Sequence, residues 1–135
     1  MSAPQKQPRR RSDPRSLLAL MDRWPDSWAG VSEDRQVGAA LVARMRPFVV
    51  HLQELDLSQK TIRRHLHNLW VLGGEIIRQV NYEPELRKSE PRQLLLDSVA
   101  DGQAPLVPHA TEDEQRSFDA TARRLLRFLI ATDPR

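Results

Sequence analysis

An apolar side chain recurs every three or four positions from Ile62 to Val80, and this spacing constrains the fold more than any other feature of the chain. Side chains three and four positions apart share one face of an α-helix, so the segment predicts a helix with a continuous apolar stripe. The stripe consists of Ile62, Leu66, Leu69, Gly73, Ile76, Ile77 and Val80. Ser58 precedes the helix and is a favourable N-cap residue. A helix of this kind has to bury its apolar face against other elements of the chain.

Gly73 and Gly74 lie in the middle of this predicted helix. Each glycine in a helix interior costs about 1 kcal/mol relative to alanine, so a compensating contact is expected. We expect the backbone of a neighbouring helix to approach closely at this point. A local kink is the alternative.

Two helices are predicted upstream. Asp13 and Pro14 resemble an N-cap followed by proline at the first helical position, and Pro25 should end the short helix that they open. The second helix should start after Ser32 and carry an apolar stripe up to the LDL turn. Pro47 interrupts that stripe and predicts a kink or a break near Arg46, because proline cannot donate to the helical ladder.

Two helices are also predicted downstream. Ser89 can cap a helix that contains Leu94–Leu96 and ends at Asp101-Gly102. Thr111 and Glu114 match a capping box, which opens the last helix. The inward face of that helix is expected to comprise Phe118, Ala122, Leu125, Leu126 and Leu129.

The chain is therefore predicted to be all-α, a compact bundle of four to five helices with orthogonal or irregular packing. No segment alternates apolar and polar residues for long enough to predict a strand. Residues 14–135 are expected to form a single helical domain. Residues 1–13 are rich in Pro, Gln, Arg and Ser and are predicted to be a disordered basic arm.

The residues that usually carry catalysis or bind metals form no recognisable pattern. The chain has no cysteine, and its histidines match no metalloprotease motif. His65 and His67 are two positions apart, which places them on different faces of a helix, so they cannot hold one metal ion together. His65 is predicted to be a partly buried structural histidine. We expect a protein that is not an enzyme and that has no cofactor.

The longest apolar runs are far too short to cross a bilayer, and no signal peptide pattern follows the basic N-terminus. We expect a cytoplasmic protein with no membrane partner.

The segment from Ser58 to Trp70 reads SQKTIRRHLHNLW and contains no acidic residue. On a helix, Lys60, Arg64 and His67 line one polar strip, and Arg63 lies beside it. A rigid helix that presents cations in this way suits contact with phosphates, so these four side chains are DNA-binding candidates. The alternative is a solvated helix face that is basic without binding any ligand.

Charge is distributed unevenly along the chain. From Met1 to Trp24 there are six basic and two acidic residues, whereas from Asn81 to Arg135 there are eight basic and ten acidic residues. This distribution predicts a polyanion-binding surface in the front and middle of the chain. In the arm, the candidates for contact with phosphates or a minor groove are Arg9, Arg10 and Arg11.

The stretch from Phe48 to Ile77 resembles the core-binding, SAM-like N-terminal domain of tyrosine recombinases and phage integrases. The matching positions are Phe48, Leu52, Leu57, Ser58, Thr61, Ile62, His65 and Leu69. The resemblance implies a domain of four to five helices that clamps one face of double-stranded DNA, with contacts from Lys60, Arg63 and Arg64. The family's catalytic set is absent, since no histidine of this chain is followed three positions later by arginine.

The tryptophans support a different prediction. Trp24 and Trp28 flank Pro25 in a segment whose pattern does not bury them, so they either cover the bundle end or form a docking patch. Exposed tryptophans are typical of protein interfaces. An adaptor that binds a protein partner, or a second copy of itself, is therefore the alternative to a DNA-binding module. Trp70 is expected to pack at the edge of the apolar stripe.

Overall fold

The computed structural model describes residues 14–132, and every regular element in this range is a helix. The elements are α1 (Pro14–Met21), α2 (Trp24–Trp28), α3 (Glu33–Glu54), α4 (Gln59–Tyr82), the 3-10 helix η1 (Pro84–Lys88), α5 (Pro91–Ser98) and α6 (Glu112–Ala131). All of the α-helices except α2 have eight residues or more. The predicted all-α bundle of four to five helices is confirmed. The predicted arm, residues 1–13, lies outside the described residues.

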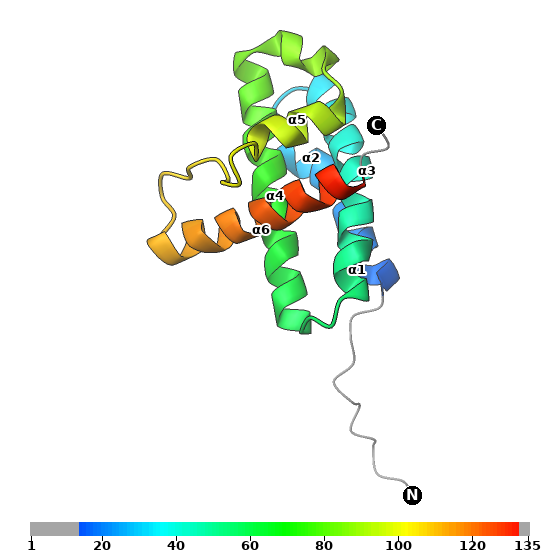
Figure 1. Ribbon diagram of the computed structural model, residues 1–135. Coiled ribbons are helices and arrows are strands. Elements are labelled where there is room, and N and C mark those ends of the chain that lie inside the picture. The colour runs from blue at the N-terminus through cyan, green and yellow to red at the C-terminus, as the bar shows by residue number, and fades with distance from the viewer. Residues whose placement is uncertain (1–13, 133–135) are drawn as a thin grey trace, which may run out of the picture.

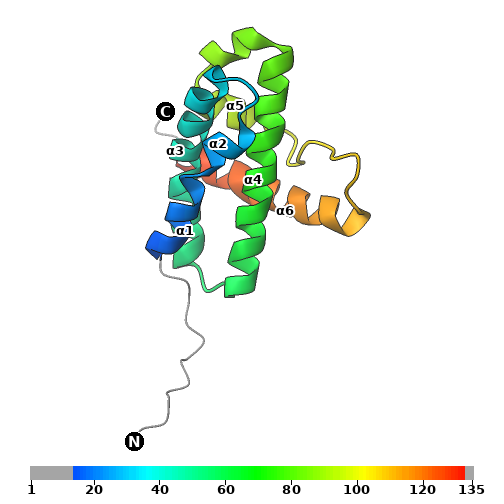
Figure 2. The same ribbon diagram turned by 180° about the vertical axis from the view of Figure 1, so that it is seen from behind.

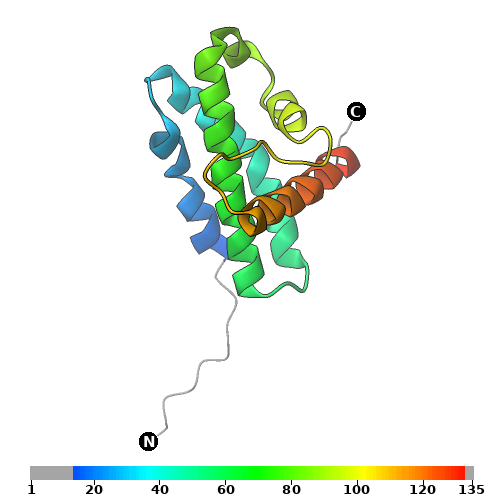
Figure 3. The ribbon, with the colours of Figure 1, turned by 90° about the vertical axis from the view of Figure 1, so that its left-hand side faces the viewer.

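The long helices α3 and α4 form a central antiparallel pair joined by a short turn (Figure 1). From behind, α1 and α2 cover one side of this pair (Figure 2). In the side view, α5 and α6 lie on the opposite side, so that the bundle has three layers (Figure 3). The largest fully buried side chains include Met21, Leu41, Met45, Phe48, Leu52, Leu69, Leu72, Ile77, Leu95 and Leu125. The core is thus continuous through all three layers.

Helix α4 follows the predicted pattern closely. The Ser58 hydroxyl accepts a hydrogen bond from the backbone N–H of Thr61 at 3.1 Å, and the whole predicted stripe is buried. The expected close approach at Gly73 exists, but a side chain makes it. A Cβ at Gly73 would lie only 2.2 Å from Cζ2 of Trp28. The expectation of a neighbouring backbone is therefore wrong, because the indole of α2 fills the space that the missing side chain leaves.

Helix α3 starts at Glu33, directly after Ser32, as predicted. Of the two alternatives predicted near Arg46, a kink or a break, the break is wrong, because the helix continues through Pro47 to Glu54. Proline inside a helix costs about 3 kcal/mol. Pro47 itself is exposed, but the residues around it are buried on the core side, and their packing offsets this local cost.

The ends of the shorter helices differ from the predictions. The first helix ends at Met21, and Pro25 lies in the first turn of the separate helix α2, where a missing N–H leaves no bond unmade. Helix α5 begins after Glu90 with Pro91 and ends at Ser98, so Ser89 does not cap it. The capping box of α6 is confirmed in both of its hydrogen bonds.

Candidate nucleic-acid interface

The four predicted cations of α4 lie on its first half, and Lys60, Arg63, Arg64 and His67 are all exposed. The Ser58 cap fixes the start of this half, and the burial of Ile62, Leu66 and Leu69 sets which way the cations point. The three arginines of the arm, Arg9, Arg10 and Arg11, lie outside the described residues.

The arginines of the described chain fall into paired and unpaired groups. Six arginines on other parts of the surface form ion pairs: Arg35, Arg44, Arg46, Arg78, Arg87 and Arg116. Within residues 14–132, neither Lys60 nor Arg63 nor Arg64 has a carboxylate at ion-pair distance. These three side chains in the first half of α4 therefore have no ion pair within the described part of the chain.

Helix α6 adds two arginines that the sequence analysis missed. The charges of Arg124 on α6 and of Arg64 on α4 both lower the pKa of His65, which lies between these helices. Arg127 follows Arg124 along the same helix and, like it, has no ion pair among the described residues. We refer to Lys60, Arg64, Arg124 and Arg127 together as the cationic band.

The contact beneath the cationic band is polar. His65 Nδ1 lies 2.7 Å from Thr121 Oγ1, which also accepts a hydrogen bond of 2.8 Å from Asn68 Nδ2. Asn68 Nδ2 donates to the backbone carbonyl of Ser117 as well, at 3.2 Å. His65, Asn68 and Thr121 are all buried. Burial, and then the charges of Arg124 and Arg64, lower the pKa of His65 to about 4. The prediction of a structural histidine is confirmed.

Of the two alternatives predicted for Trp24 and Trp28, covering the bundle end or forming a docking patch, the structure contradicts an exposed patch that includes both. Trp28 has only 9% of its surface exposed, so its assignment as an interaction residue is corrected. Its indole N–H donates to the backbone carbonyl of Trp70 at 2.9 Å, which ties α2 to the middle of α4. The apolar pattern of α4 does not predict this hydrogen bond, because the bond joins residues 42 positions apart in the sequence. Trp24 is half-buried, whereas Trp70 is 39% exposed in place of the expected packing against the core.

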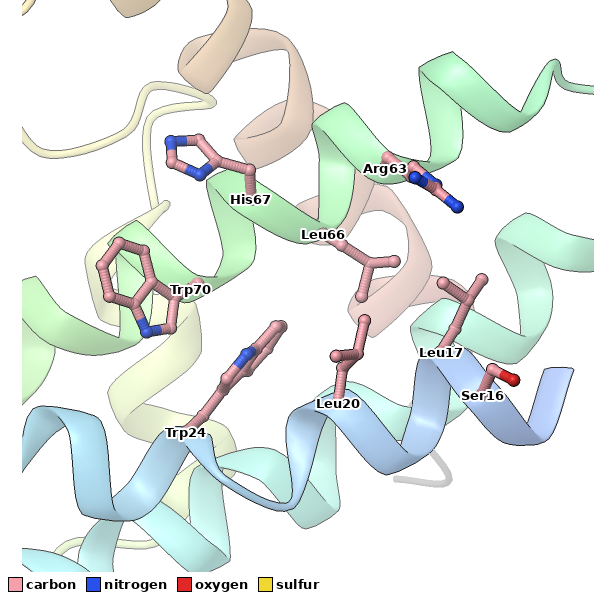
Figure 4. A pocket seen from close by; sticks show the side chains of 8 residues that line it. All are labelled: Ser16, Leu17, Leu20, Trp24, Arg63, Leu66, His67 and Trp70. Atoms are coloured by element: carbon pink, nitrogen blue, oxygen red, sulfur yellow. The ribbon is translucent and has the colours of Figure 1, made fainter. Parts of the chain in front are cut away.

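A groove lies between α1, α2 and α4, on the side of α4 that faces away from α6. Its volume is about 550 Å³, and its lining comprises Ser16, Leu17, Leu20, Trp24, Arg63, Leu66, His67 and Trp70. Figure 4 shows Trp24 and Trp70 at one end of it, with Leu20 and Leu66 facing each other beside them. We call it the tryptophan groove. Sequence reasoning missed it because its two walls come from helices far apart in the sequence.

On the other side of α4, a second hollow of about 500 Å³ lies against the start of α6. Its lining includes Arg64 and His67, but also the carboxylates Asp113 and Glu114. These acids belong to the first turn of α6, where negative charge favours the helix N-terminus. These carboxylates make the second hollow less favourable for an anionic ligand than the tryptophan groove, whose lining has no carboxylate.

Comparison of the chain with protein-family models, with curated proteins and with solved structures found no match. The resemblance to recombinase core-binding domains therefore stays a prediction. Among the residues described, no three His, Asp or Glu side chains are grouped so that they could hold a metal ion. No helix within 14–132 has the length and apolar character that crossing a membrane requires.

Proposed function

We propose that this chain is a non-catalytic DNA-binding module that contacts the phosphates of a duplex through α4 and the neighbouring end of α6. The observation that carries the proposal is a set of cations on α4 and α6 that have no ion pair. Lys60, Arg63, Arg64, Arg124 and Arg127 have no carboxylate partner among the described residues, as is also true of Arg23, Lys88 and Arg123, whereas six other arginines are ion-paired. Cations without internal partners on rigid helices are what phosphate contact requires.

The arrangement suits backbone contact better than the reading of bases. The cations belong to α4 and α6, two helices that cross in Figure 1. Both helices are tied to each other by buried hydrogen bonds, which hold the charges in place before a ligand arrives. Contacts of this kind supply affinity and orientation but little sequence preference. The adaptor alternative loses part of its basis, because Trp28 is buried.

The test is fluorescence anisotropy of a labelled duplex of about 30 base pairs, titrated with the full chain at about 50 mM and about 200 mM salt. Each phosphate neutralised contributes about −0.9 to the slope of log K against log salt, so a band of four cations predicts a slope of about −3 to −4. Reversal of two charges, Arg63→Glu with Arg64→Glu, should abolish binding at the lower salt concentration.

The matched control carries Arg35→Glu and Arg78→Glu, which change the net charge equally but replace ion-paired arginines on other parts of the surface. This control should keep most of the duplex affinity. Equal losses in both double variants would show attraction by net charge alone, and affinity that is insensitive to salt would also exclude the proposal.

A further inference from the structure

The tryptophan groove places aromatic side chains next to an arginine that has no ion pair among the described residues. Its lining contains two tryptophans and three leucines, together with Arg63 and His67 from α4, and it includes no carboxylate. Its volume of about 550 Å³ falls within the range of small-molecule sites, about 300 to 1,000 Å³.

The protein itself holds the aromatic wall in place. The indole N–H of Trp70 donates to the Ser27 hydroxyl at 2.9 Å, and that hydroxyl donates to the backbone carbonyl of Trp24 at 2.7 Å. The Trp24 ring in turn packs against the buried Trp28, with ring centroids 5.8 Å apart. Because the N–H of Trp70 is already bonded, its exposed part offers an apolar ring surface and no unmet donor. A surface fixed in this way loses little conformational freedom when a flat ligand stacks on it.

The charges of the groove select among flat ligands. Arg63 has no ion pair within residues 14–132, and His67 lies near Trp70 with ring centroids 5.9 Å apart. Cations beside aromatic side chains are the combination with which proteins hold single-stranded nucleic acid, since the bases stack while the backbone meets positive charge. An apolar protein segment would fill the space between the leucines but would leave Arg63 without a counter-charge.

We infer that the tryptophan groove holds an unpaired nucleobase, so that the chain prefers a DNA end or junction carrying unpaired nucleotides to a blunt duplex. This inference rests on the proposed function, because the same α4 cations that contact the duplex also guide the unpaired strand into the groove. Stacking tolerates any base, so the preference concerns strand state and not sequence.

The experiment compares three labelled probes of equal length: a blunt duplex, a duplex with a single-stranded overhang of about six nucleotides, and oligothymidylate. Anisotropy gives the affinities, and tryptophan emission gives a local signal because Trp24 and Trp70 line the groove. We expect the overhang probe to bind about tenfold more tightly than the blunt duplex and to quench the emission.

Two variants locate the effect in the groove. Trp70→Ala removes the stacking surface, and Leu20→Glu places a carboxylate on a side chain that is 59% exposed. Both variants should lose the preference for the overhang while they keep the affinity for the blunt duplex. Leu106→Glu is the matched control, because Leu106 is 80% exposed and lies outside the groove.

The outcomes separate the two proposals. Equal affinity for blunt and overhang probes, with unchanged emission, overturns the base site and leaves duplex binding intact. Failure to bind any probe removes the proposed function as well. Dimerisation of the free chain in sedimentation, abolished by Leu20→Glu but not by Leu106→Glu, would identify a protein segment as the occupant and also overturn the inference.

Discussion

His65 links a buried hydrogen bond to the stability of the molecule across a defined pH range. Its pKa is about 4 in the folded chain, against an ordinary value of 6.5, because burial and then the charges of Arg124 and Arg64 disfavour the protonated ring. Between these two values the unfolded chain binds a proton that the folded chain does not. Stability is therefore unaffected by this residue above pH 6.5 and falls as the pH is lowered from 6.5 toward 4.

The prediction is a loss on the order of 3 kcal/mol across that window, measured by urea unfolding at several pH values. His65→Gln should flatten the pH dependence, since the replacement does not titrate. His109→Gln is the matched control, because His109 is exposed, and it should leave the pH dependence of the parent chain unchanged. A full pH dependence in the His65→Gln variant would contradict this account.

At the scale of elements, the short helix α2 is held against α4 by one side chain. The Trp28 indole lies over Gly73, and its N–H donates to the carbonyl of Trp70. A Cβ at the neighbouring Gly74 would lie 3.4 Å from Trp28 Cδ1, which is an ordinary contact distance. The two adjacent glycines therefore have different roles, although they look equivalent in the sequence.

Gly73→Ala should lower the free energy of unfolding by about 1 to 3 kcal/mol or more, because the new methyl group collides with the indole. Gly74→Ala should raise it by up to about 1 kcal/mol, since alanine favours the helix and the space exists. Thermal or urea unfolding followed by far-ultraviolet circular dichroism measures both. Similar effects of the two substitutions would show that the Trp28 indole does not pack directly over Gly73.

Elements whose signals are local were predictable, whereas contacts between distant elements were not. The α4 stripe and the caps at Ser58 and Thr111 depend on residues within a few positions of each other, so the sequence displays them. The burial of Trp28 depends on a partner 42 residues away. The contact of Thr121 with His65 likewise depends on where two helices cross, which no local pattern encodes. For the same reason the sequence predicted the cations of α4 but not the arginines of α6 or the tryptophan groove.

At the scale of the whole molecule, Asp34 connects three segments. Its fully buried carboxylate accepts hydrogen bonds from the backbone N–H groups of Gly30 and Val31, from Asn81 at the end of α4, and from Arg87 in η1. Burial raises its pKa, but these hydrogen bonds together lower the pKa below its ordinary value of 3.8. Its contribution to stability is therefore complete above that value and is lost as the pH falls below it.

Asp34→Asn should destabilise the fold by about 3 kcal/mol at neutral pH, because the amide replaces an acceptor and leaves Arg87 without its carboxylate. Asp26→Asn is the matched control, since the Asp26 side chain is 75% exposed and its ion pair with Arg35 lies at the surface. Urea unfolding should show little change for this variant. Equal effects of the two substitutions would mean that the hydrogen bonds of Asp34 do not hold these segments together.

The hydrogen bonds between α4 and α6 also fix the position of α6 along its own axis relative to α4. Contacts between apolar side chains allow one helix to shift along another. Thr121 Oγ1, in contrast, can form hydrogen bonds with His65 and Asn68 in only one position of α6. A shift of α6 along its axis by one turn, about 5.4 Å, would leave buried polar atoms without partners. Arg124 stands one turn beyond Thr121, so the same bonds determine how far apart the positive charges of the two helices are. A buried polar contact thereby sets the spacing of positive charges on the surface above it.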